Sequence, residues 1–340
     1  MKPEFFKWIT LTKKIPVYLV LIISLTCSAA WLLYQTKYVN PKEIVKAKTE
    51  DCLLPYNLSR INDERLTHPL MFADVEEESE DLMPLKEKIN NYLLSKKESN
   101  VIKNASVYFK SFKDEDWFVI NPELQYNGAS LFKVPFMIAL LKEAEDNPDL
   151  LNKRIYYEHP SGEYGPQEIL EHNLTPGKYY TLRELLLYAI AYSVNDAAFL
   201  VVNNFKFGTL NKFLAVINMK PAELHVEYYA TIEEYSRFFT ILFNAGYLNN
   251  DMSEYALELM TKSDFNDGMK RKLDKDIVVA NKFGERGVGE ERELHEFGIV
   301  FLKDQPYLLG IMTHGKDYKE LKDVLSDISS MIYEELKKDS

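Results

Sequence analysis

Cysteine is scarce in this chain of 340 residues, which contains only Cys27 and Cys52. Cys27 lies in an apolar segment, so neither a disulfide framework nor a cysteine-based metal site is expected. The six histidines are scattered, and no H-E-x-x-H or similar pair stands at metal-ligand spacing. We therefore predict no metal and no other cofactor.

An excess of positive charge is also lacking. The chain has 41 basic and 52 acidic residues, for a net charge of −11. This is the wrong sign for attracting a phosphate backbone, so no nucleic-acid partner is expected. The composition, 46% hydrophobic and 27% charged, is that of a globular protein with a full core, and the length suits one large or two modest domains.

One long segment has no charge at all. From Ile15 to Thr36 no residue is charged, and these roughly 22 residues are enough for a hydrocarbon core that needs about 20. We predict a single transmembrane anchor at 15–36. Four lysines in 1–14 favour a cytoplasmic tail, and hence a domain outside the cytoplasm at the cell membrane, although lysines also follow the anchor.

Two other interpretations of this segment are less favoured. A cleaved signal peptide would use Ser28-Ala29-Ala30 as its small-residue site, but the apolar run continues beyond it through 31–34. A lipoprotein signal would acylate Cys27, but Ser24-Leu25-Thr26 is a poor context for that reaction.

The rest of the chain predicts an α+β domain over 83–340, after a polar and acidic linker over 37–82. Strand pairs and helices alternate in an order that inserts an all-helical lobe into one mostly antiparallel sheet flanked by helices. Lys-Phe-Gly at 206–208 is expected to end a helix with a left-handed glycine. The predicted strands are 106–112, 117–120, 276–283, 295–302 and 307–312, and the predicted helical regions are 133–204, 231–245, 253–262 and 318–337.

Ser130 and Lys133 form the only S-x-x-K of the chain, where the first strand pair meets the helical region. A helix that starts near Ser130, as Asn127-Gly128 and Pro135 permit, stacks the two side chains on one face, where they can share a hydrogen bond. Burial is expected to lower the pKa of the Lys133 ammonium, which makes its amine a proton acceptor for the Ser130 hydroxyl. The alternative is an ordinary lysine that extends its ammonium to water.

Two further polar elements follow along the chain. Ser193 and Asn195 interrupt the helix that Thr181 caps, which places a hydroxyl and a carboxamide in a polar turn; alternatively, one of them simply caps the next helix. Lys282 and Gly284 end the first late strand, where they can flank a substrate that lies along the sheet edge.

In this order, the three elements resemble the class A β-lactamase and penicillin-binding-protein family of serine acyl transferases. The resemblance covers about residues 84–337 and implies the β-lactamase/transpeptidase-like fold. The matching text is Ser130-x-x-Lys133, Ser193-x-Asn195 and Lys282-x-Gly284, with Gly128–Pro135, Tyr180–Leu185 and Gly284–Gly287 around them.

The resemblance also implies a role for each residue. Ser130 is expected to attack a lactam or peptide carbonyl, with Lys133 as its base and Ser193 as the relay to the leaving nitrogen, which gives a covalent acyl-enzyme. The remaining residues are expected to bind the substrate: Asn195 its side-chain amide, Lys282 its carboxylate, Gly284 the substrate laid along the strand, and the backbone amides of Ser130 and Glu285 its oxyanion.

The sequence departs from the family pattern in two places. Its hydrolytic members have a Glu-x-x-Leu-Asn in an Ω loop that positions the deacylating water, and 218–230 contains none, which leaves Glu223 or Glu227 as weak substitutes. Phe283 replaces the hydroxyl residue inside the third motif. His295 could compensate for that change, but we favour a half-buried strand residue.

Three functions remain open at this stage. The first is a membrane-anchored β-lactamase-like serine hydrolase that acts on β-lactams or related amides. The second is a D-alanyl-D-alanine peptidase of the penicillin-binding type, whose partner would be a peptidoglycan stem peptide. The third is a catalytically silent domain that only binds peptidoglycan, in which Lys133 stays protonated.

Overall fold

The computed structural model describes residues 56–60, 70–75, 77–162, 167–223 and 226–339. The chain divides into two units, 1–45 and 46–340, and all described residues belong to the second. The predicted cytoplasmic tail and anchor lie outside the described residues. Among the residues that are described, no helix is both long and apolar enough to cross a bilayer.

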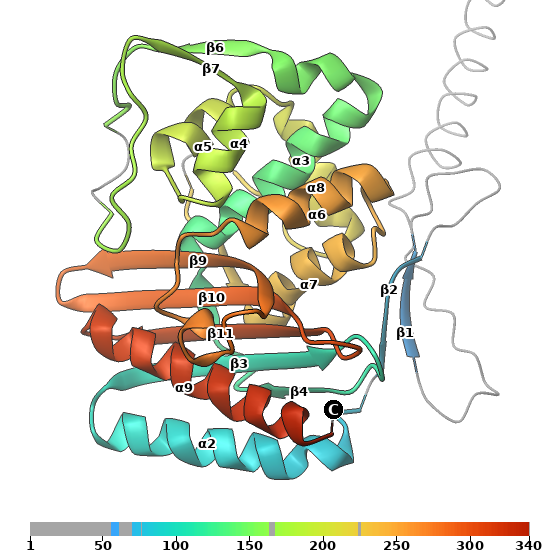
Figure 1. Cartoon of the computed structure of the whole chain (residues 1–340), viewed down its shortest axis with the longest axis vertical. Helices are drawn as coiled ribbons and strands as arrows, with labels where there is room; N and C mark the ends of the chain where they lie inside the picture. Colours follow the sequence, from blue (N-terminus) through green and yellow to red (C-terminus); the bar gives the residue numbers. More distant parts are fainter. Residues whose placement is uncertain (1–55, 61–69, 76, 163–166, 224–225, 340) are drawn as a thin grey trace, which may run out of the picture. The chain divides into compact units, whose positions relative to one another are not determined.

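A five-stranded antiparallel sheet forms the centre of the second unit (Figure 1). Its strand order is β4-β3-β11-β10-β9, so the strands before and after the helical lobe pair with one another and β9 lies at an edge. The strands are β3 (Ile102–Ser111), β4 (Trp117–Ile120), β9 (Val278–Val288), β10 (Glu291–Phe301) and β11 (Tyr307–Gly315).

Helices cover both faces of this sheet, because the strands carry apolar side chains on both (Figure 1). On one face α2 and α9 lie side by side, and Ile89, Leu325 and Ile328 in them are fully buried. The helices of this layer are α2 (Met83–Glu98) and α9 (Tyr318–Leu336). The helices of the lobe are α3 (Lys133–Asp146), α4 (Leu182–Ile190), α5 (Asn195–Val202), α6 (Phe207–Val216), α7 (Ile232–Phe243) and α8 (Asn250–Thr261).

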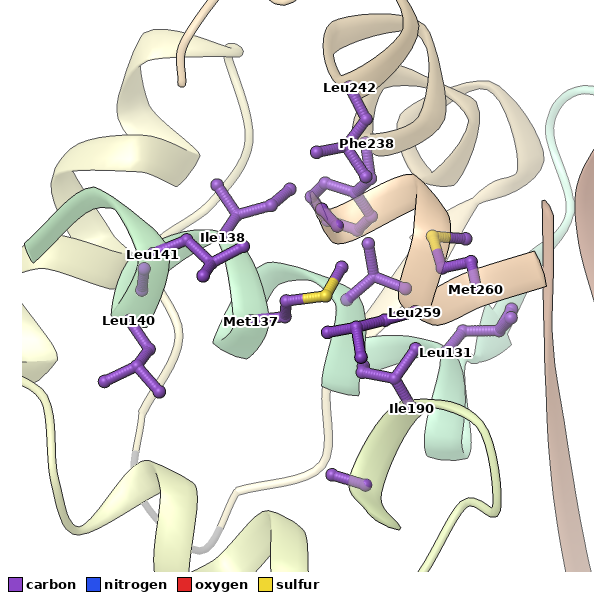
Figure 2. Packing of buried hydrophobic residues seen from close by; sticks show 14 of the residues in the cluster. Leu131, Met137, Ile138, Leu140, Leu141, Ile190, Phe238, Leu242, Leu259 and Met260 are labelled. Carbon is purple, nitrogen blue, oxygen red and sulfur yellow. The ribbon is translucent and has the colours of Figure 1, made fainter. Parts of the chain in front are cut away.

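The core of the lobe is built around α3. Met137 and Ile138 of this helix pack toward Phe238 of α7 and Leu259 of α8, as Figure 2 shows. Leu131, just before α3, joins the same cluster and is 1% exposed. The start of α3 is therefore fixed by packing from several helices, which matters because the S-x-x-K motif lies there.

Capping explains where two helices of the lobe begin. Thr181 caps α4 with a reciprocal capping box to Glu184, as the sequence predicted, and Thr231 forms the same box with Glu234 at α7. Each such cap typically stabilises a helix by about 1 kcal/mol. The α4 cap fixes the register of the helix that leads into the polar turn at Ser193.

The predicted α+β architecture with a helical lobe between the early and late strands is confirmed. The region 133–204 is, however, not continuously helical, since the hairpin of β6 (Arg154–Tyr157) and β7 (Lys178–Thr181) interrupts it. A further short pair joins β5 (Gln125–Asn127) to β8 (Tyr229–Thr231). The Lys-Phe-Gly at 206–208 begins α6 rather than ending a helix, so that prediction was wrong.

Several shorter elements complete the unit. Within the predicted linker 37–82, the structure describes an antiparallel hairpin of β1 (Tyr56–Arg60) and β2 (Leu70–Val75). The 3₁₀ helices are η1 (Glu80–Leu82), η2 (Ala129–Phe132), η3 (Pro148–Asn152), η4 (Met269–Lys272) and η5 (Lys337–Asp339).

Candidate active site

Ser130 lies in the 3₁₀ turn η2, immediately before α3. The residue before it, Ala129, has a φ of +46°, a left-handed conformation that costs a non-glycine residue of order 1–3 kcal/mol and persists only where the surroundings impose it. The Asn127 side chain supports the turn, because its Oδ1 accepts a hydrogen bond from Ala129 N at 2.9 Å. Ser130 itself is partly exposed.

Lys133, the first residue of α3, is buried and directs its ammonium to the polar turn between α4 and α5. Its Nζ donates to Asn195 Oδ1 at 2.8 Å, to the Ser193 carbonyl, and to Ser193 Oγ at 3.4 Å. In the described part of the chain no hydrogen bond joins Lys133 Nζ to the Ser130 hydroxyl, so the expected direct bond is not formed. Burial lowers the pKa of Lys133 to about 7, against the opposing effect of the Glu285 carboxylate.

Ser193 links the lobe to the sheet. It is fully buried in the polar turn with a φ of +60°, and its Oγ accepts a hydrogen bond from Lys282 Nζ at 2.8 Å. Lys133 and Lys282 therefore approach one hydroxyl from two sides, and the hydroxyl proton remains free to be donated elsewhere. The bond that Val194 N donates to Tyr188 O, at 2.9 Å, holds this turn against α4.

Lys282 lies in β9, with no exposed surface. Besides Ser193, it donates to the Phe283 carbonyl at 2.7 Å. Burial and the nearby Lys133 ammonium hold the pKa of Lys282 well below its usual value. The Phe283 ring stacks on Phe265 at 4.4 Å in the core beneath α9, so the residue that replaces the family's hydroxyl is part of the packing on that side.

Gly284 brings β9 against the Ser130 turn. A Cβ at this position would lie 3.2 Å from Leu131 N and only 2.4 Å from Gly128 O, and the second distance is too short for a real Cβ contact. Glycine is thus required here for backbone approach. The peptide units of Gly284 and Glu285 consequently run next to that of Ser130, where two amides could face one oxyanion.

His295, in β10, supports the same turn through its imidazole ring. It pairs with Gly284 across β10 and β9, its Nε2 donates to Asn127 O at 3.1 Å, and its Nδ1 accepts from Thr313 N at 3.2 Å. It is fully buried rather than half-buried, and burial lowers its pKa to about 3. A neutral imidazole bonded to two backbone groups supports the turn and brings no charge to a substrate carboxylate.

The Gly284 contact leads to a first prediction. With Ser130 in its expected role, Gly284→Ala should slow acylation by roughly 10- to 100-fold, because its methyl group forces β9 away from Gly128 and misplaces the backbone amides beside Ser130. Gly208→Ala is the matched control, since a Cβ there meets nothing within 4 Å. Stopped-flow or gel-based labelling with a fluorescent penicillin measures both rates, and equal rates for the two variants would contradict the assignment.

One of the two glutamates suggested as the deacylation base is already paired with an arginine. Glu227 accepts a hydrogen bond from Arg286 at 2.8 Å, and this guanidinium lowers the pKa of the Glu227 carboxyl. Glu223 is exposed. The Tyr228 ring packs against Phe132, with centroids 4.5 Å apart, so an aromatic pair lies beside the start of α3.

Sequence reasoning missed the residues that connect the two sides of the site. Gln167 donates to the Ser193 carbonyl at 3.0 Å, and the Glu285 carboxylate accepts bonds from the backbone of 168 and 169. Arg286 and Glu227 are also a pair that the sequence did not suggest. Because each partner is far from the other along the chain, no local pattern signals these contacts.

Comparisons with known proteins identify the family and the fold. The model of the β-lactamase enzyme family matches residues 84–336. Comparison with curated proteins gives no match at all.

Among solved structures, the acyl-enzyme complex of the PBP-A L158E mutant with penicillin G is similar, with a TM-score of 0.64, 17% identity, and coverage of 76% of this chain and 97% of that one. A β-lactamase from Chitinophaga pinensis has a TM-score of 0.63 and 17% identity, covering 74% and 99%. A class A β-lactamase representative from Bacteroides cellulosilyticus has a TM-score of 0.64 and 18% identity, covering 75% and 99%.

Proposed function

Because this chain belongs to the β-lactamase enzyme family, we propose that it is a serine hydrolase that forms an acyl-enzyme on Ser130 with β-lactams or related amides. The observation that carries the proposal is the convergence of two buried lysines on the Ser193 hydroxyl beside the Ser130 turn. Burying two amines around one hydroxyl costs folding free energy. A role of these amines in proton transfer accounts for their retention despite that cost.

In the proposed reaction the Ser130 oxygen attacks the substrate carbonyl, and its proton moves to the neutral amine of Lys133. The tetrahedral oxyanion is held by the backbone amides of Ser130 and Glu285. As the carbon–nitrogen bond breaks, Ser193 donates its hydroxyl proton to the leaving nitrogen and is reprotonated by Lys133. The product is an ester on Ser130, with Lys282 facing the substrate carboxylate and Asn195 its side-chain amide.

Intact-protein mass spectrometry after exposure to benzylpenicillin tests this proposal. We expect a penicilloyl adduct, mapped by peptide analysis to Ser130, whose decay over time reports hydrolysis. A folded protein that never forms the adduct would refute the proposal and favour the third possibility, a domain that binds peptidoglycan without reacting.

A second candidate is a D-alanyl-D-alanine peptidase of the penicillin-binding type, which shares the acylation step. The ion pair of Glu227 with Arg286 favours it, because a carboxylate whose pKa is lowered by a guanidinium is a poor base for the deacylating water. This candidate expects a penicilloyl adduct that persists for hours, and release of D-alanine from a stem-peptide substrate.

The position of Glu227 gives a second prediction. Glu227→Ala should change the release rate of the penicilloyl adduct by less than about twofold, since an exposed, paired carboxylate contributes little to the chemistry. Glu223→Ala serves as the parallel variant. Mass spectrometry of the adduct over time provides the measurement, and a tenfold slower release in either variant would identify that glutamate as the base.

We further propose that residues 15–36 anchor the protein in the cell membrane, with the domain outside the cytoplasm. The uncharged segment and the lysines before it support this arrangement. A β-lactam or a peptidoglycan stem peptide would reach the domain on that side. Protease accessibility of the domain in intact cells tests the orientation.

A further inference from the structure

We propose that the segment Gln167–His172, here called the strap, limits the size of the acyl side chain that can reach Ser130, and that Glu285 is the residue that positions it. This inference rests on the proposed function and goes further, because it identifies what selects among substrates.

The strap is fastened to the edge strand of the sheet. The Glu285 carboxylate, in β9, accepts hydrogen bonds from Glu168 N at 3.1 Å and from Ile169 N at 3.4 Å. Bonds from backbone amides to an ionised acceptor are stronger than those to a neutral one. Glu285 directly follows Gly284, which touches the Ser130 turn, so the strap lies at the part of the β9 edge nearest the nucleophile.

The strap is also fastened to the opposite side of the site. Gln167 Nε2 donates to the Ser193 carbonyl at 3.0 Å, and the same oxygen accepts the hydrogen bond from Lys133 Nζ. One strap residue thus shares an acceptor with the proposed base. Lys133 Nζ also donates to Asn195, which is the residue expected to bind the substrate side-chain amide.

Further contacts hold the rest of the strap in place. Arg292 approaches the Glu168 carboxylate at 3.4 Å, and His172 Nε2 lies 2.8 Å from Asp264 Oδ2. The His172 ring packs against Tyr192, the neighbour of Ser193, with centroids 4.6 Å apart. Ile169 and Leu170 pack against the core beneath α9.

These attachments connect the polar turn of the lobe to the free edge of β9. A substrate laid along that edge, with its side-chain amide at Asn195, must place its acyl side chain next to Gln167 and the backbone of Ile169. A compact side chain avoids the strap, whereas a bulky one must displace it and break the bonds to Glu285. The cost of breaking them then appears as slower acylation of substrates with large side chains.

The test compares two probes on the full-length protein: 6-aminopenicillanic acid, which has no acyl side chain, and benzylpenicillin, which has one. In Glu285→Ala and in Gln167→Ala, the acylation rate constant for benzylpenicillin relative to that for 6-aminopenicillanic acid should rise about tenfold, which equals about 1.4 kcal/mol. Glu285→Gln keeps an acceptor and should give a smaller rise. Glu171→Gln, an exposed carboxylate of the same strap, is the matched control and should leave the ratio unchanged.

Hydrogen exchange gives a readout that a general loss of stability would not reproduce. Glu285→Ala should accelerate exchange of the amides at 168 and 169 and leave those of α3 protected. A ratio within twofold of the wild-type value in both alanine variants, with Ser130 still acylated, would overturn this inference alone. Absence of any adduct in the wild-type protein would overturn the proposed function and this inference with it.

Discussion

Ser130→Ala is expected to abolish the penicilloyl adduct, with a loss of at least about 10⁴-fold in the acylation rate. The hydroxyl of Ser130 is the partly exposed nucleophile candidate beside the close contact of Gly128 and Gly284, and no covalent ester can form without it. The fold should be retained, because removing one partly exposed oxygen leaves the packing around Leu131 intact.

The control for this experiment is Ser95→Ala, at an exposed position of α2 where the hydroxyl donates to the Tyr92 carbonyl, and it should leave labelling unchanged. Thermal unfolding confirms that both variants fold. An adduct that persists on Ser130→Ala would place the nucleophile elsewhere, and Ser193 would be the first residue to test.

Lys133→Met is expected to slow acylation by roughly 10³-fold, within the usual range for losing a general base. Methionine has a similar length and fills the buried position without an amine, so the loss reports proton transfer rather than a cavity. Burial lowers the pKa of Lys133 to about 7, which makes the neutral, proton-accepting form dominant above that pH. The wild-type acylation rate should therefore rise as the pH increases through about 7 and then level off, and the variant should lose this rise.

Lys142→Met is the matched control, because Lys142 lies on the same helix but bonds to Glu145 and the Tyr247 carbonyl at the surface. Its rate and pH profile should equal those of the wild type. A pH profile that keeps its rise in Lys133→Met would assign the titrating base to another group, of which Lys282 is the nearest candidate.

Local patterns predicted much of the site. The capping box of Thr181 fixed the start of α4, and the break in apolar periodicity at Ser193 marked the turn that the structure shows. Each of these depends on interactions within one or two helical turns, which a sequence displays directly. The resemblance of the three motifs to the β-lactamase and penicillin-binding-protein family then implied which turns meet.

What could not be predicted depends on contacts between distant segments. The partner of Lys133 was expected to be Ser130, three residues before it, yet its ammonium bonds to the turn at Ser193 and Asn195. The hydrogen bond from the strap to the Glu285 carboxylate also joins segments far apart along the chain, so the sequence did not predict it. Lys206-Phe207-Gly208 was misassigned because a glycine fits the first turn of a helix as well as the position after its last turn, and only tertiary packing decides between them.

The order of strands in the sheet determines when the sheet beside the candidate site can be completed during synthesis. β3 pairs with β11, so that Phe109 meets Leu309, and within this five-stranded sheet β9 pairs with β10 alone. A nascent chain that extends through β9 and β10 but ends before Tyr307 already contains Ser130, Lys133 and Lys282, but it lacks β11, the strand that joins the early and late parts of the sheet. Such long-range pairing is slow, and until it forms, the apolar surface of the lobe stays available to chaperones and proteases.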